Sequence, residues 1–125
     1  MSENVVSPLS VGECTMSASH DGSTLVARFS GTADMRATEG IATWLLALHT
    51  AAILGETRAV VVDMRELEFM NSSCFKGFVT WITTMQEAEV DRRYRVTFVS
   101  NPSLHWQRRS LPTLRCFAAD LITIE

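Results

Sequence analysis

The sequence predicts an α/β protein in which a mixed β-sheet carries helices on one side. Two observations support this class. Near the N-terminus, apolar and polar residues alternate strictly, and later apolar residues occur in β-branched runs or at helical spacing. The predicted order of elements is β-β-α-β-α-β-α-β. Because connections between parallel strands are right-handed, the helices that follow the opening hairpin are expected on one face of the sheet.

The N-terminal ten residues show no sustained period and contain Pro8. We therefore expect a flexible leader over 1–10, followed by one domain over 11–125. A length of 125 residues is typical of a single domain with its own core.

The opening hairpin is predicted by period-two alternation. Polar and apolar residues alternate over 13–19, which is typical of a strand with one solvent-exposed face. Residues 20–23 include Asp-Gly, which provides the positive φ that a tight turn requires. A second alternating strand is expected over 24–30, followed by a connecting loop over 32–38.

The first helix is predicted by apolar residues at three- and four-residue spacing within 41–54. We expect Gly55 to end it as a left-handed cap. Residues 59–64 are dense in β-branched side chains and predict a buried central strand.

The C-terminal half continues the alternation of helices and strands. A long helix is expected after residues 71–73, a strand over 94–100 and a short helix over 104–109. Leu111-Pro112 is expected to break the chain before a terminal strand over 121–125.

Composition excludes several classes of protein. Eleven basic and fourteen acidic residues give a net charge of −3, which argues against nucleic-acid binding through a broad cationic surface. The apolar stretch 41–54 is too short to span a bilayer, and no secretory signal is present, so we expect a cytoplasmic protein without membrane contact. Three scattered cysteines indicate free thiols. The three histidines are unpaired, so we expect no metal site, and no glycine-rich loop or other motif indicates a cofactor.

The candidate site is the turn between the central strand and the second long helix. Asn71 and Ser72 are both good helix N-caps, and adjacent hydroxyls at a helix start are also positioned to carry a phosphate. The two roles are compatible. Lys76 lies in the first turn, where a cation opposes the helix dipole unless an anion is near; the alternative is a solvated side chain.

The segment VVVDMRELEFMNSSCFKGFV resembles the signature of STAS domains, the fold of bacterial anti-sigma factor antagonists. Phe69-Met70 is similar to the hydrophobic pair of that signature, and Asn71-Ser72-Ser73-Cys74 is similar to its Asp-Ser-Ser/Thr-Gly motif. The segment that ends in Asp34 and the closing strand also fit, so the resemblance covers nearly the whole chain.

The resemblance implies a phosphorylation-gated protein-binding module. Ser72 would be the phosphoacceptor, with Ser73 as second choice, and Asp34, Asn71, Ser73 and Lys76 would belong to the partner-binding surface. The implied partners are a serine kinase that is itself an anti-sigma factor and a cognate serine phosphatase. The implied state is a monomer or weak homodimer with no enzymatic activity of its own.

Two alternatives follow from departures at the motif. Asn71 and Cys74 replace the usual Asp and Gly, which favours a STAS-fold scaffold or self-associating module that is not phosphorylated. Cys74 near a helix start also permits a small thiol enzyme. The Cys-x5-Arg phosphatase pattern is absent because Thr80 stands at the Arg position, so we expect Cys74 to be a small buried residue.

Overall fold

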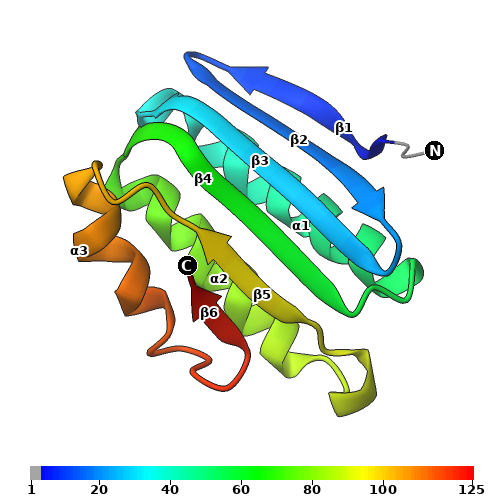
Figure 1. The fold of residues 1–125 in the computed structure, drawn as a ribbon. Coiled ribbons are helices and arrows are strands. Elements are labelled where there is room, and N and C mark those ends of the chain that lie inside the picture. Colours follow the sequence, from blue (N-terminus) through cyan, green and yellow to red (C-terminus); the bar gives the residue numbers. More distant parts are fainter. Residues whose placement is uncertain (1–3) are drawn as a thin grey trace.

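The computed structural model describes residues 4–125 and shows one six-stranded sheet with helices packed against one face (Figure 1). The strands are β1 (Asn4–Val11), β2 (Cys14–Asp21), β3 (Thr24–Ala33), β4 (Ala59–Met70), β5 (Arg95–Val99) and β6 (Ile122–Ile124). They lie in the order β1-β2-β3-β4-β5-β6. The first two pairs are antiparallel and the last three parallel, so the sheet is mixed, as the sequence predicts.

Three α-helices occur over residues 4–125: α1 (Thr38–Leu54), α2 (Ser72–Glu87) and α3 (His105–Leu114). Short 3₁₀ turns η1 (Met35–Ala37) and η2 (Val90–Arg92) precede α1 and β5. In Figure 1, α1 and α2 lie behind the sheet, while α3 lies beside the end of β4.

The core lies between the sheet and the two long helices. Phe29 of β3 is buried and packs edge-on against Trp44 of α1, with ring centroids 5.4 Å apart, and against Phe78 of α2 at 5.3 Å. Burying such rings stabilises a core by about 3–5 kcal/mol each, judged by the cost of truncation to alanine. One aromatic residue therefore joins the sheet to both helices.

The predicted flexible leader is wrong over residues 4–10. They belong to β1, which pairs antiparallel with β2 from Asn4↔Ser19 to Val11↔Cys14. Register irregularities around Pro8 hide the alternation, and Pro is tolerated because β1 is an edge strand. The Trp44 indole N–H donates to the Ser7 carbonyl at 3.0 Å, which fixes β1 to α1. Residues 1–3 of the predicted leader lie outside the described residues.

Three predicted boundaries also differ. Gly55 has φ −87°, and the left-handed conformation falls on Glu56 at φ 53°. Pro112 lies inside α3 and does not end it, because the missing amide hydrogen affects only the last turn while Leu111 and Leu114 are buried in the core. The predicted loop over 32–38 is shortened by β3, which continues to Ala33.

The helical run Met35–Leu54 is long and apolar enough to cross a membrane by length and composition, with mean hydropathy 1.3. A third of the most apolar stretch is buried in the fold. Ile41, Leu45 and Leu48 are fully buried against the sheet, so part of this apolarity is used in packing the domain. The helical run is longer than the predicted stretch 41–54, so the length argument against a membrane span is wrong.

Strand β4 extends six residues beyond the predicted strand and carries the candidate site at its end. Its buried positions are two residues apart at first and three apart later, at Val60, Val62, Met64, Leu67 and Met70. The change follows from register irregularities against β3, where Arg28 pairs with Asp63 but Ser30 pairs with Glu66.

Beyond Asp63, β4 no longer pairs with β5, and side chains from the α3 region bind its carbonyl groups. The Gln107 amide donates to the Met64 and Leu67 carbonyls at 2.6 and 3.1 Å. The Trp106 indole also donates to the Leu67 carbonyl, at 3.1 Å. On the side where β5 no longer pairs, these side chains bind the β4 carbonyl groups that a neighbouring strand would otherwise bind.

Candidate partner-binding site at the start of helix α2

The junction between β4 and α2 is organised by Asn71. Its side-chain oxygen accepts from the Cys74 backbone N–H at 2.9 Å, so Asn71 is the N-cap of α2, in agreement with the sequence prediction. Its own backbone N–H donates to the Ala33 carbonyl at 2.9 Å. One residue therefore starts the helix and fastens its beginning to the end of β3.

The two adjacent hydroxyl residues differ in exposure. Ser72 is the first residue of α2 and is exposed, whereas Ser73 is only partly exposed. A modifying enzyme needs access to the hydroxyl oxygen, so the geometry favours Ser72 over Ser73 as an acceptor.

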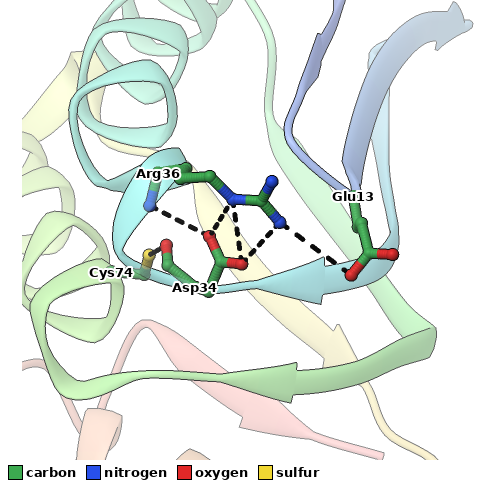
Figure 2. A network of polar contacts seen from close by, with 4 residues as sticks. All are labelled: Glu13, Asp34, Arg36 and Cys74. Atoms are coloured by element: carbon green, nitrogen blue, oxygen red, sulfur yellow. Dashed lines mark hydrogen bonds and ion pairs between the residues drawn. The ribbon is translucent and has the colours of Figure 1, made fainter.

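Cys74 connects the start of α2 to the segment after β3 (Figure 2). Its side chain is completely buried, and its Sγ donates to the Asp34 carbonyl at 3.3 Å. The Thr38 hydroxyl lies 3.7 Å from the same sulfur. Together with the Asn71–Ala33 bond, this contact brings Asp34 beside the Asn71-Ser72-Ser73 turn.

The Asp34 carboxylate is held by Arg36 (Figure 2). It accepts from the Arg36 backbone N–H at 2.9 Å and forms an ion pair with the guanidinium at 2.8 Å, while Glu13 lies 3.9 Å from the same guanidinium. Hydrogen bonds from the Arg36 side chain are the main cause that lowers the pKa of Asp34. The sequence did not lead us to Arg36 or Glu13. The Asp-x-Arg spacing of Asp34 and Arg36 could have indicated their ion pair, but no sequence pattern indicated that Glu13 lies near Arg36.

No family model matches the sequence, and no curated protein matches it. Among solved structures, an anti-sigma factor antagonist from Mycobacterium paratuberculosis is similar, with a TM-score of 0.61 and 15% sequence identity. The match covers 88% of this chain and 85% of that one. This chain has the STAS fold.

In this STAS fold, exposed apolar side chains flank the candidate site. Met35, next to Asp34, is 77% exposed, and Phe69, two residues before Asn71, is 47% exposed. The two residues of the predicted hydrophobic pair therefore differ in exposure: Phe69 is exposed, whereas Met70 is buried. Exposed apolar area marks a protein-binding surface where it forms a contiguous patch rimmed by polar groups.

Lys76 is exposed and lies one turn after Ser72 on α2. Residues four apart on a helix are neighbours on its surface, about 6 Å between their Cβ atoms. A negative group on Ser72 would therefore lie within reach of the Lys76 ammonium.

The Cys74 thiol has the surroundings of a structural residue. Burial is the largest cause that raises its pKa, and the neighbouring Asp34 raises it further, against an opposing effect of the Thr38 hydrogen bond. A nucleophilic cysteine needs the thiolate, which these surroundings disfavour. The prediction that Cys74 is small, buried and packed at this junction is confirmed.

Within residues 4–125, no three His, Cys, Asp or Glu side chains are grouped so as to hold a metal ion. His49 instead forms a hydrogen bond of 2.7 Å with the Tyr94 hydroxyl, at the other end of the helices from Asn71.

Proposed function

We propose that this protein is a cytoplasmic, phosphorylation-gated binding module that acts as an anti-sigma factor antagonist-like regulator. Its partner would be a serine kinase of the anti-sigma factor type, and a cognate serine phosphatase would reverse the modification. The observation that carries the proposal is the exposed Ser72 hydroxyl at the first position of α2, in a turn that also gathers Asp34 and Asn71.

The surface around Ser72 favours docking in the unmodified state. Met35 and Phe69 offer exposed apolar area, and the Asp34 charge is already balanced by Arg36. Desolvating this surface therefore costs little compared with desolvating an unpaired charge.

A phosphoryl group on Ser72 would reverse that preference. It adds about −1.5 to −2 charges at neutral pH to a surface that a partner covers. Moving a binding equilibrium from 1:99 to 99:1 requires about 5.5 kcal/mol, which a buried, poorly paired dianion is able to supply. Lys76 would offset part of this charge on the free protein, where the phosphate stays solvated.

The proposal is tested first by phosphopeptide mass spectrometry of the protein from its native cells, and then by binding. Against the kinase identified by co-purification, Ser72→Ala should bind like the unmodified protein, and Ser72→Glu should bind at least tenfold more weakly. Ser72→Gln is the matched control, since it has the size of glutamate without the charge, and it should bind close to the unmodified protein. Equal dissociation constants for Ser72→Ala and Ser72→Glu would refute the switch.

A second candidate is a scaffold of the same fold that binds its partner constitutively or associates with itself. The exposed Met35 and Phe69 side chains favour it, because they provide a docking surface that needs no phosphate. The absence of phosphate on Ser72 and Ser73 under several growth conditions, with binding retained, would support this candidate. The thiol-enzyme alternative is disfavoured by the burial of Cys74.

A further inference from the structure

A second surface feature lies between the first turn of α2 and helix α3. It is an open cavity of about 490 Å³, lined by Phe75, His105, Trp106, Arg109, Ser110 and Thr113. Cavities of roughly 300–1,000 Å³ are typical of ligand sites. The lining combines aromatic rings, two hydroxyl groups and basic side chains.

Helix α3, which forms most of the cavity lining, is cationic although the whole protein is acidic, while the exposed Glu66 and Glu68 flank the Leu67 carbonyl that Trp106 binds. Residues 101–119 contain three arginines and one histidine and no Asp or Glu, in a chain of net charge −3. His105, Arg108 and Arg109 are all exposed, and Arg108 donates to the His105 Nδ1 at 3.3 Å. In the described part of the chain, ion pairs within 4 Å involve only Arg36 and Arg65 as cations. The Arg109 guanidinium therefore has no carboxylate partner there.

The wall of the cavity is fixed by the fold. Trp106 donates to the Leu67 carbonyl at 3.1 Å, and the buried Gln107 bonds to the Met64 and Leu67 carbonyls. These contacts hold α3 against the end of β4, so the aromatic wall and the basic rim are already in position before a ligand arrives. A preformed site loses less entropy on binding than one that must be ordered.

We propose that this cavity binds an acidic segment of a partner protein that also carries an aromatic or aliphatic side chain. The charge favours carboxylates, because Arg109 can donate two parallel hydrogen bonds to a planar carboxylate. The volume favours a peptide over a single oxyanion, since a water molecule occupies only about 30 Å³ of liquid. The Phe75 and Trp106 rings provide the apolar contact.

The site is separate from the proposed switch and does not depend on modification of Ser72. Phe75 lies three residues after Ser72 on α2, so a partner that covers the start of α2 could contact both surfaces. The test below uses the unphosphorylated chain, and its outcome therefore does not depend on whether Ser72 is a phosphoacceptor.

The test is titration of the isotope-labelled 125-residue protein with the peptide Glu-Leu-Glu-Phe-Glu, followed by amide chemical shifts, with Gln-Leu-Gln-Phe-Gln as the neutral control. We expect shifts in α3 and the first turn of α2, and a dissociation constant at least tenfold higher for the neutral peptide. Arg109→Glu should weaken binding of the acidic peptide at least tenfold. The matched variant Arg58→Glu, exposed at the opposite end of β4, should change it less than twofold.

Several results would overturn the proposal. Equal binding of the two peptides, or an unchanged dissociation constant in Arg109→Glu, would show that charge does not select the ligand. Shifts confined to β1 and α1 would locate the peptide elsewhere. Inorganic phosphate that shifts the α3 amides, with no response to the peptide, would indicate an oxyanion site instead. Arg109→Gln is a milder second variant should Arg109→Glu lose the dispersed spectrum of the folded protein.

Discussion

Gln107 provides a direct test of how the end of β4 is held. Its side chain is 1% exposed and forms three hydrogen bonds: it accepts from the Asn101 N–H at 2.7 Å and donates to the Met64 and Leu67 carbonyls. Gln107→Leu keeps nearly the same volume and removes all three. The Leu67 carbonyl keeps its bond from Trp106, whereas the Asn101 N–H and the Met64 carbonyl each lose this partner.

The expected loss of stability follows from these contacts. Each net hydrogen bond is worth about 1 kcal/mol, and a buried polar group left without its partner costs about 1–3 kcal/mol. Gln107→Leu should therefore lower the free energy of unfolding by about 3 kcal/mol. In a chain of this size that corresponds to a fall in Tm of roughly 10 °C.

The assay is urea unfolding followed by circular dichroism. The midpoint should fall while the slope of free energy against urea concentration stays unchanged, because the surface exposed on unfolding is the same. Arg108→Ala is the control: this neighbour on α3 is exposed, and its loss should change stability by less than about 0.5 kcal/mol. If Gln107→Leu lowers the free energy of unfolding by less than about 1 kcal/mol, the hydrogen bonds from Gln107 to the β4 carbonyl groups do not stabilise this end of the strand as we infer.

Three further predictions concern other parts of the molecule. Burial lowers the pKa of His49 below its ordinary 6.5, so the stability that neutral His49 contributes is complete above pH 6.5 and is lost as the pH falls through the folded-state pKa. His49→Gln, which can still accept from Tyr94, should make the free energy of unfolding depend less on pH in this range, and an unchanged pH dependence would contradict this. Gly31 has φ +90°, and a Cβ there would lie 1.8 Å from the Glu13 carbonyl oxygen. Gly31→Ala should therefore lower the free energy of unfolding in urea by about 3 kcal/mol or more, and a variant as stable as the wild-type protein would show that the backbone relaxes. Of the three cysteines only Cys116 is exposed, so mass spectrometry after brief alkylation should find one modified thiol in the native protein and three in urea; rapid modification of a second thiol would contradict the burial of the other two.

Much of the fold follows from local patterns in the sequence. The alternation from Cys14 and the Asp21-Gly22 turn produced the expected hairpin, with Gly22 at φ 64°. The helical spacing of apolar residues located α1 and α2, and Asn71 acts as the predicted cap. These features depend on neighbours along the chain, so periodicity and capping chemistry are sufficient to predict them.

Other elements depend on contacts between distant residues. β1 is a strand because β2 offers it a free edge, and its irregular register around Pro8 leaves no clear period two. The second half of β4 was missed because its buried residues change from a spacing of two to a spacing of three. Pro112 remained within α3 because Leu111 and Leu114 pack into the core, which outweighs the helix-breaking tendency of proline.

The sequence by itself determined the α/β class and the start of α2 at the Asn71 cap. The phosphoacceptor role of Ser72 and the binding role of Asp34 stay predictions from the resemblance to STAS domains. Only the tertiary structure decided how these groups meet: the Cys74 thiol binds the Asp34 carbonyl, Asn71 binds the Ala33 carbonyl, and Arg36 holds the Asp34 carboxylate. It also revealed the basic cavity between α2 and α3. The physical reason is that periodicity reports which face of an element is buried, whereas hydrogen bonds between separate elements depend on strand register and helix packing, which no local pattern specifies.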